Sequence, residues 1–505
     1  MNRKYEEYRS LMQKISDVSY ANALLSWDQE VSMPPKGAAA RARQSATLSG
    51  ITHDLFTGEK TGTLLEELSG DKTLSFSEAR NVAETYKSYK KAKKYSTDFV
   101  ITLSKTISES FEAWNRAKKE NNFSIFAPLL EKIIKLKREE AGILGYTEHP
   151  YDALLDQFEP EAKTKDVERI FEDVKKELVP FVKEIATHPQ PEQGIMFMHY
   201  PRQKQWDLGI ELLKQMGYDF EAGRQDISTH PFTTNFGALD VRVTTRINEH
   251  DLGEMLWSCI HEGGHALYEQ GLNNGDYGLP SSESISLGIH ESQSRLWENN
   301  VGRSLPYWKA NFPRLQQIFP ENLGKASAED FYKAMNTVKP SLIRTSADEL
   351  TYHFHILIRF ELEKALIEGS LEVKDLTSAW NKKYKEYLGV DVPSDSKGVL
   401  QDIHWSHGLI GYFPTYSLGS FYAAQFYSKA SADIPGLEDQ ISKGQLKPLL
   451  GWLRENIHQH GKLYSSEEIS KRITGEKLNF KYFLRYAKNK YAALYNLKAE
   501  TEKTS

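Results

Sequence analysis

Cysteine is almost absent from this 505-residue chain, which contains only Cys259. A single cysteine excludes an internal disulfide and is typical of proteins from a reducing compartment. Cys259 lies two residues before His261, and on a helix two such side chains point about 200° apart. We therefore expect a small buried apolar residue here, not a thiolate that binds the same metal as the histidine.

Long apolar runs and a strong charge of one sign are also missing. No stretch approaches the ~20 apolar residues that span a bilayer, and the N-terminal residues lack the apolar segment of a secretory signal. The formal net charge of -5 is small for this length, so nothing favours nucleic acid or an anionic membrane as a partner. We expect a cytoplasmic protein that binds neither.

Helical spacing of apolar residues dominates what is present. From Lys4 to about Gly145 apolar residues recur every three or four positions, which predicts helices. The segment 76–121 has no Gly or Pro and predicts two long helices with a break near Ser96. The segment 164–186 predicts a helix pair hinged at Pro180. The chain is therefore expected to be mainly α.

One segment departs from this pattern. Residues 239–247 alternate apolar and polar side chains and are rich in β-branched types, which predicts a strand in a small sheet. No internal repeat, low-complexity segment or long flexible linker separates domains. A single domain over residues 1–505 is the simplest interpretation.

The strongest chemical motif is His261-Glu262-Gly263-Gly264-His265, inside a predicted helix over about 252–270. Positions i and i+4 share a helix face, so both imidazoles can reach one Zn²⁺ ion. Glu262 is then placed as the general base for a metal-bound water. The two glycines each cost ~0.8–1.0 kcal/mol relative to Ala in a helix, which favours close approach of another backbone or a substrate.

A catalytic zinc site needs a third protein ligand and an open fourth position. Glu291, in the sequence His290-Glu291-Ser292-Gln293, lies on a second predicted helix after a Gly- and Pro-containing turn. His290 is an alternative ligand, and Glu298 is expected on the same helix face as Glu291. Spacing favours Glu291 without excluding His290. The competing interpretation of the whole motif is a pair of histidines on an ordinary helix.

Six short motifs in order resemble those of the thermostable carboxypeptidase 1 family of zinc metallocarboxypeptidases. They extend over about 230–425, and the helical first half is compatible in length and pattern. The motifs are His230-Pro231-Phe232, Asp240-x-Arg242-x-Thr244, the zinc helix, His290-Glu291-Ser292-Gln293, Ile343-Arg344-x-x-Ala347-Asp348 and Gly398-x-x-Gln401-Asp402-x-His404-Trp405.

The resemblance implies a neurolysin-like helical fold with a deep active-site groove, and a small antiparallel sheet is expected beside the zinc helix. In this arrangement 1–229 forms a helical groove wall, 230–425 carries the catalytic motifs, and 426–505 adds C-terminal helices. The resemblance further implies release of single residues from peptides with a free C-terminus, a homodimer, and Zn²⁺ with Co²⁺ also effective. It also assigns Glu291 as the third ligand.

A carboxypeptidase must recognise a terminal carboxylate, and the planar fork of arginine does so best. Arg344 is the first candidate and Arg242 the second. The alternative for Arg344 is a salt bridge to Asp348, one helical turn away. Gln401 is a further candidate for contact with substrate.

Asp240 and Thr244 belong to the predicted strand, and two interpretations of it remain open. An extended peptide could add to the strand as to a sheet edge, which would make these residues substrate contacts. Alternatively, the strand is purely structural. The sequence does not separate the two.

The developing oxyanion of peptide hydrolysis needs a donor beside the metal, and a Tyr hydroxyl or a His can supply it. The family resemblance favours Tyr416, then His404, with Tyr412 and His407 as further possibilities. Two other functions remain open. One is a zinc oligopeptidase that cuts internally, and the other is a peptide-binding protein with a structural zinc.

Overall fold

The computed structural model describes residues 2–497, and the chain is mainly α-helical, as expected. Its residues form two compact units. The first unit combines residues up to Lys93 with Glu192–Met335 and Phe426–Lys477, and the second combines Lys94–Pro191, Asn336–Gln425 and the residues from Leu478 onward. Four expectations stay predictions: a single domain over 1–505, its division into the sections 1–229, 230–425 and 426–505, a neurolysin-like fold, and a deep active-site groove.

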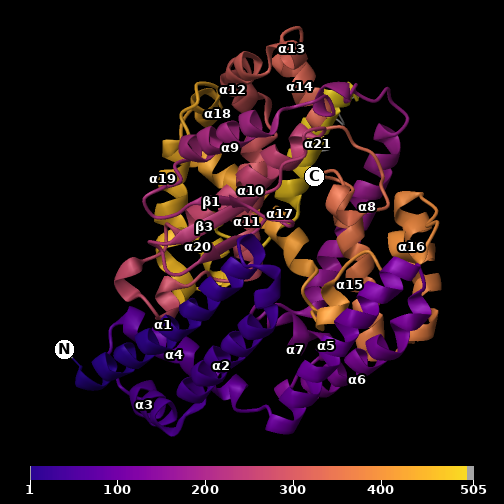
Figure 1. The fold of residues 1–505 in the computed structure, drawn as a ribbon. Coiled ribbons are helices and arrows are strands. Elements are labelled where there is room, and N and C mark those ends of the chain that lie inside the picture. Colours follow the sequence, from indigo (N-terminus) through magenta and orange to yellow (C-terminus); the bar gives the residue numbers. More distant parts are fainter. Residues whose placement is uncertain (1, 498–505) are drawn as a thin grey trace. The chain divides into compact units, whose positions relative to one another are not determined.

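The first unit contains the predicted zinc helix and the strands (Figure 1). Its helices are α1 (Arg3–Val31), α2 (Ala38–Thr57), α3 (Glu59–Ser69), α4 (Phe76–Ala92), α9 (Arg202–Met216), α10 (Leu252–Glu269), α11 (Leu287–Arg295), α12 (Leu305–Ile318), α13 (Pro320–Leu323), α14 (Ala328–Met335), α18 (Leu437–Ser442), α19 (Lys447–Asn456) and α20 (Ser466–Thr474).

The second unit contains α15 (Tyr352–Glu368) and helices that come before and after it in the sequence. These other helices are α5 (Thr97–Glu120), α6 (Ala127–Leu144), α7 (Pro150–Leu155), α8 (Thr164–Ile185), α16 (Leu376–Leu388) and α21 (Lys481–Tyr495). Of these, α6, α7, α8 and α16 contact α15. Helix α17 (Pro414–Asp433) begins in this unit and ends in the first.

Local signals in the helical first half are partly confirmed. Helices α4 and α5 are separate, and the Ser96 side chain caps α5 by accepting from the Phe99 amide. The predicted hinge at Pro180 is wrong, because α8 continues through the proline as one helix. Pro180 is exposed, whereas Leu178 and Phe181 beside it in the sequence are buried, so burial of the helix face next to the proline can offset the lost hydrogen bond.

The sheet has three short strands in the order β1-β3-β2. Strand β1 (Gln225–Ile227) pairs parallel with β3 (Val241–Thr245), whereas β2 (Thr233–Asn235) pairs antiparallel with it. The sheet is thus mixed and not wholly antiparallel as expected. Strand β3 has a partner on each side, so it cannot be the edge to which a peptide adds. It packs against α10, the helix with the His-Glu-x-x-His motif.

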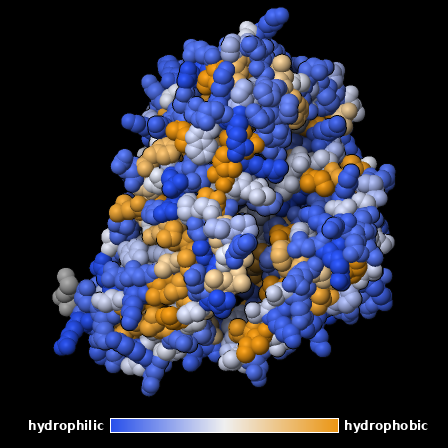
Figure 2. Space-filling view, viewed as in Figure 1, coloured by the Kyte–Doolittle hydropathy of each residue, from blue (hydrophilic) through white to orange (hydrophobic). Residues whose placement is uncertain are grey.

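None of the helices within residues 2–497 combines the length and the hydropathy needed to cross a bilayer. Figure 2 shows hydrophilic side chains over most of the viewed face, with apolar side chains in scattered groups.

Candidate active site

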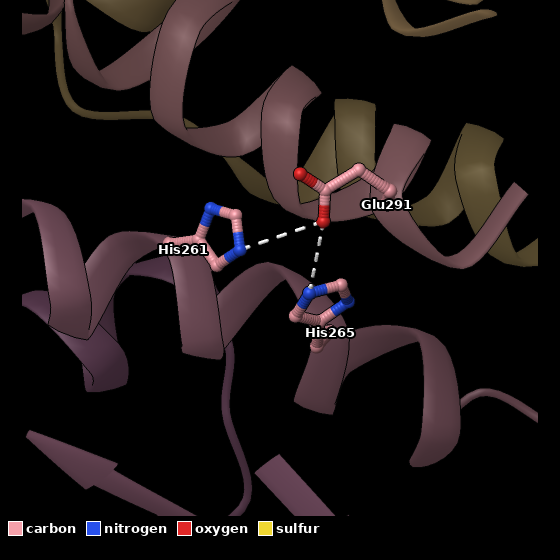
Figure 3. Close-up of side chains that lie close together, drawn as sticks. All are labelled: His261, His265 and Glu291. Atoms are coloured by element: carbon pink, nitrogen blue, oxygen red, sulfur yellow. Dashed lines mark ion pairs between the residues drawn. The ribbon is translucent and has the colours of Figure 1, made fainter. Parts of the chain in front are cut away.

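Two helices of the first unit bring three potential metal ligands together. Glu291 Oε2 of α11 lies 3.6 Å from His261 Nε2 and 3.4 Å from His265 Nε2 of α10 (Figure 3). One ligand atom from each residue lies within 4.8 Å of the others. Bond lengths of about 2.0–2.2 Å in a tetrahedral zinc site require ligand atoms about 3.3–3.6 Å apart. The cluster therefore fits a tetrahedral divalent metal.

The close approach of the two helices depends on the glycines of the motif. A Cβ added at Gly264 would lie 2.7 Å from Ser294 Cα and 2.8 Å from the Gln293 carbonyl oxygen of α11. A Cβ at Gly263 would lie 2.7 Å from Leu213 Cδ2 of α9. The expectation that another backbone closely approaches this part of the helix is confirmed, and that backbone is α11.

His290, the alternative ligand, is occupied otherwise. Its Nε2 lies 2.7 Å from Glu269 Oε1, and its ring stacks on His265 with centroids 4.4 Å apart. Among the described residues, the ligand cluster contains His261, His265 and Glu291 but not His290. The geometry thus supports Glu291 as the third ligand, and His290 packs behind His265.

Glu298 orients the first histidine, a role that the sequence did not reveal. Its Oε2 lies 2.8 Å from His261 Nδ1, so it holds the ring with Nε2 toward the cluster. Glu298 belongs to a π-helical turn, Leu296–Gly302, that directly follows α11, and such turns often occur at functional sites. The one signal in the sequence was its expected place on the same helix face as Glu291.

Two arginines of the first unit form ion pairs with the carboxylates of Glu291 and Glu298. Arg295 donates from Nε to Glu291 Oε1 at 2.6 Å and from Nη1 to Glu298 Oε2 at 3.1 Å. Arg303 donates to Glu298 Oε1 at 3.1 Å and lies 3.9 Å from the ring centroid of Trp257. Burial acts to raise the pKa of Glu291, but Arg295 and His261 outweigh it and lower that pKa well below its usual range. Glu291 is therefore ionised, the form that binds metal.

The two histidines have opposite pKa shifts. Burial acts to lower the pKa of His261, but the carboxylates of Glu291 and Glu298 outweigh it and raise that pKa. Burial, helped by the nearby His290, lowers the pKa of His265 to about 3. His265 is therefore neutral at pH 7 and ready to act as a ligand.

Glu262 is buried, and the sheet holds it in place. Thr233 Oγ1 of β2 donates to Glu262 Oε2 at 2.6 Å and lies 3.0 Å from the Glu262 carbonyl oxygen. Burial raises the pKa of Glu262. A carboxylate with a raised pKa is a stronger base, so this position suits proton transfer.

Asp240, Arg242 and Thr244 form their hydrogen bonds within the first unit. Asp240 accepts two hydrogen bonds from Arg242, both 2.8 Å long, and the Arg242 guanidinium lies 4.6 Å from the ring centroid of Trp27. Thr244 is buried, and its hydroxyl lies 2.6 Å from Ser228 Oγ. Contact of Asp240, Arg242 or Thr244 with substrate stays a prediction.

The second unit contains a buried cluster around Arg344. Its Nε donates to Asp402 Oδ1 at 2.9 Å and its Nη1 to the Tyr352 hydroxyl at 3.0 Å. The alternative interpretation of Arg344 as a salt-bridged residue is right about the ion pair and wrong about its partner, which is Asp402 and not Asp348. Helix α15 begins only at Tyr352, and Asp348 accepts from the backbone amides of Leu350 and Thr351 at the helix start.

Three further motif residues gather beside Arg344. The Arg344 amide donates to Gln401 Oε1 at 3.0 Å, and Gln401 Nε2 donates to the Leu342 carbonyl at 3.0 Å. The Arg344 guanidinium carbon lies 5.1 Å from the ring centroid of Tyr416, whose hydroxyl lies 3.2 Å from His404 Nε2. Arg344, Gln401, His404 and Tyr416 thus form one cluster.

His404 is electrically neutral in this cluster. Burial lowers the pKa of His404 to about 3, although nearby Asp402 acts to raise it; Arg344 and Arg359 act in the same direction as burial. The two other oxyanion candidates have aromatic contacts: the Tyr412 ring lies 5.2 Å from Phe158, and the His407 ring 5.0 Å from Phe111. Sequence reasoning did not identify Thr233, Arg295, Arg303 or Arg359, because nothing in their spacing marks them.

A model of the carboxypeptidase Taq (M32) metallopeptidase family matches residues 7–491. This chain belongs to the M32 metallopeptidase family. It is 41% identical over 506 residues to thermostable carboxypeptidase 1 of Thermus thermophilus, an alignment that covers 97% of this chain and 99% of the relative. It is 39% identical over 498 residues to carboxypeptidase 1 of Bacillus subtilis, with the same coverage.

Solved M32 structures have the same fold. The M32 carboxypeptidase of Deinococcus radiodurans superposes with a TM-score of 0.96 at 38% identity, covering 98% of this chain and 100% of that one. Metallocarboxypeptidase 1 of Trypanosoma cruzi superposes with a TM-score of 0.93 at 33% identity, covering 97% and 99%. This M32 chain is a metallocarboxypeptidase, and its family implies a divalent metal and peptide substrates.

Proposed function

We propose that this M32 enzyme uses Zn²⁺, held by His261, His265 and Glu291, to release single residues from the C-terminus of peptides. The observation that carries the proposal is the closeness of three ligand atoms: Glu291 Oε2 lies 3.4 and 3.6 Å from the two histidines, and all three atoms lie within 4.8 Å of one another. A structural zinc would be closed by four protein ligands, whereas the cluster found in the described residues has three. Co²⁺ accepts similar nitrogen and oxygen ligands and is proposed as an effective substitute.

Glu262 is proposed as the general base. A divalent metal at this site lowers the pKa of water and polarises the carbonyl of the scissile bond. Glu262, with its pKa raised by burial, takes a proton from the attacking water and passes it to the departing amine. The hydrogen bond from Thr233 keeps the carboxylate in a single orientation during both transfers.

Arg344 is proposed to bind the terminal carboxylate of the substrate. Two guanidinium groups, those of Arg344 and Arg359, share the single carboxylate of Asp402. One positive charge is therefore in excess in a buried place, where a carboxylate from a substrate is strongly favoured. An amide at the same position gains much less, and this difference would give selectivity for a free C-terminus.

Tyr416 is proposed as the donor to the oxyanion, with His404 as its partner. A neutral imidazole can accept from the Tyr416 hydroxyl or donate to it, and the two atoms lie 3.2 Å apart. Gln401 bonds to the backbone on either side of Ile343, so we assign it to shaping the Arg344 loop. We likewise assign Asp240, Arg242 and Thr244 to shaping the first unit near Glu262, since β3 pairs with the strand of Thr233.

The cellular setting and the assembly are further parts of the proposal. We infer a cytoplasmic enzyme, because the single cysteine fits a reducing compartment. The homodimer is supported by family resemblance alone. Sedimentation equilibrium of the full chain tests it, and a monomer at micromolar concentration would refute it.

The experiment that tests this function compares a blocked dipeptide with its amidated twin, using zinc-loaded wild type and Glu262→Gln. We expect cleavage of the free acid alone, and near-complete loss of activity in a variant that still holds its metal. Glu254→Gln serves as the matched control, because Glu254 lies two turns earlier on α10 and pairs with Arg246. Equal cleavage of both peptides would indicate an oligopeptidase, and cleavage of neither would contradict the proposal.

A further inference from the structure

Helix α15 of the second unit carries two fully buried, oppositely charged side chains one turn apart, Arg359 and Glu363 (Figure 1). Both bind the same segment, 402–411, which lies just before α17. Arg359 binds its first residue, Asp402, whereas Glu363 binds Trp405 and Gly411. The two side chains therefore hold the segment at its start, its middle and its end.

Arg359 fixes Asp402, and Asp402 fixes Arg344. Arg359 Nε donates to Asp402 Oδ2 at 2.7 Å, while Arg344 Nε donates to the other oxygen at 2.9 Å. Arg359 is itself rigidly held, since its Nη1 donates to the His355 carbonyl at 2.7 Å and its guanidinium lies 4.5 Å from the centroid of Trp380. The direction of the Arg344 guanidinium is thus set from α15 through one shared carboxylate.

Glu363 holds the other end of the segment with three hydrogen bonds. It accepts from the Tyr151 hydroxyl of α7 at 2.7 Å, from Trp405 Nε1 at 2.7 Å and from the Gly411 amide at 2.9 Å. Trp405 directly follows His404, and Gly411 lies five residues before Tyr416. A single carboxylate thereby sets where His404 lies and where the chain turns toward Tyr416.

The chain can reach Glu363 at Gly411 only because that residue is glycine. Its φ of 96° lies in the left-handed region, and an added Cβ would lie 2.8 Å from the backbone carbon of Leu154 in α7. The segment therefore rests directly on the α7 backbone. This tight fit leaves it little freedom to move away from Glu363.

We propose that Arg359 and Glu363 are positioning residues with separate targets. Arg359 acts through Asp402 on Arg344 and so on the binding of the terminal carboxylate. Glu363 acts through Trp405 and Gly411 on His404 and Tyr416, and so on the chemical step. This inference rests on the roles proposed above for Arg344, His404 and Tyr416.

A purely structural role would give a different kinetic pattern. Buried charges can often be replaced by apolar groups without loss of stability, so their presence here favours a demand for precise placement. Loss of fold stability would lower the concentration of active enzyme, and so the apparent kcat of both variants, without changing KM; expressing kcat per mole of folded enzyme removes this effect. Separate positioning tasks instead change KM in one variant and kcat in the other.

The test measures kcat and KM of the zinc-loaded full chain on the free-acid dipeptide and on its amidated twin. For Arg359→Met we expect KM for the free acid to rise about tenfold and the preference for the free acid to fall, with kcat little changed. For Glu363→Gln we expect kcat to fall about tenfold or more, since small misplacement of reacting groups is costly, with KM little changed.

Glu361→Gln is the matched control, because Glu361 lies on the same helix but pairs with Lys383 and accepts from the Tyr387 hydroxyl. We expect it to keep both constants. Two milder variants keep the test informative if Arg359→Met or Glu363→Gln does not fold. Arg359→Lys keeps the charge without the fork and should regain part of the free-acid preference, whereas Tyr151→Phe removes one donor to Glu363 and should lower kcat less than Glu363→Gln does.

The outcomes separate this inference from the function on which it rests. If Arg344→Met keeps the free-acid preference, the role proposed for Arg344 fails first. If Arg344→Met loses that preference while Arg359→Met and Arg359→Lys keep it, the positioning role of Arg359 is overturned. Parallel changes of kcat and KM in the Arg359 and Glu363 variants, or unchanged kcat in both Glu363→Gln and Tyr151→Phe, would overturn the separation of tasks.

Discussion

The two units contain buried charged clusters of opposite design. In the first unit one arginine, Arg295, bonds to two carboxylates, those of Glu291 and Glu298. In the second unit one carboxylate, that of Asp402, bonds to two arginines, Arg344 and Arg359. With Glu262, the first cluster has three buried carboxylates beside two arginines, Arg295 and Arg303. Around Asp402 the two guanidinium groups instead outnumber the one carboxylate that they share.

This difference indicates what each cluster is built to bind. A surplus of carboxylates beside two histidines favours a divalent cation. A surplus of guanidinium groups favours a carboxylate. The shared ion in each cluster reduces repulsion between the like charges that flank it, so that a buried surplus is tolerated until a ligand neutralises it.

Removal of the cation should have the largest effect on this contrast. We expect chelation to reduce peptidase activity by about 10³-fold or more, because water activation depends on the metal, and added Zn²⁺ to restore it. His265→Ala should not be restored by Zn²⁺, whereas His199→Ala, an exposed histidine of the same unit, should behave as wild type. Activity that survives exhaustive chelation would show that the first cluster needs no cation.

Neutralising one carboxylate of the first unit should weaken metal binding, and so reduce the difference between the two clusters. Glu298→Gln removes the negative charge beside His261 and leaves one acceptor oxygen in place of the two that His261, Arg295 and Arg303 now share. We expect zinc affinity to fall 10- to 100-fold, measured by competition with a chromogenic chelator. Glu254→Gln should keep the affinity of wild type. An unchanged affinity in Glu298→Gln would mean that the histidine is oriented in another way.

Glu363 of the second unit provides a test by pH. Burial raises its pKa from 4.5 to about 7, although its hydrogen bonds act to lower it. A raised pKa means that the folded protein binds the proton more tightly, so this contribution to stability is present below pH 4.5 and is lost as pH rises toward 7. The expected loss is about 3 kcal/mol.

Urea unfolding at pH 5, 6, 7 and 8 measures this loss. Glutamine does not ionise, so the stability of wild type relative to Glu363→Gln should fall by about 3 kcal/mol between pH 5 and pH 8. A constant difference across this range would show that Glu363 stays ionised throughout.

The smallest effect is expected for Arg242, the second candidate for carboxylate binding. Its two bonds go to Asp240, in the turn just before its strand, so no positive charge is in excess there. Arg242→Lys should change stability by about 1 kcal/mol or less, as for other partly exposed pairs, and should keep the preference for a free C-terminus. Loss of that preference would transfer the carboxylate-binding role from the second unit to the first.

Local patterns predicted what depends on neighbouring residues. The spacing of His261 and His265, the break near Ser96 and the small sheet all follow from helix and strand geometry over a few residues. The glycines of the zinc motif also indicated close packing, which α11 provides. In each case the deciding contact lies within one element or between adjacent ones.

Predictions failed where a partner distant in sequence decides. Arg344 pairs with Asp402, 58 residues away, and not with nearby Asp348. Pro180 does not hinge α8, which continues as one helix with buried residues, Leu178 and Phe181, before and after the proline. Spacing placed Glu298 on the same helix face as Glu291, but its hydrogen bond to His261, 37 residues away, was not anticipated. The role of Glu363 depends on contacts among α15, α7 and the segment 402–411. These contacts cannot be read from a single sequence.

One cluster is proposed to bind a cation and the other a carboxylate. The most direct test of this division measures the preference for a free-acid over an amidated peptide in Arg344→Met and Arg344→Lys. Zinc content is measured on the same samples. We expect Arg344→Met to lose most of the preference while it keeps a full complement of zinc, and Arg344→Lys to retain part of the preference. An unchanged preference in Arg344→Met, or a loss of zinc together with the preference, would contradict the division between a cation-binding first unit and a carboxylate-binding second unit.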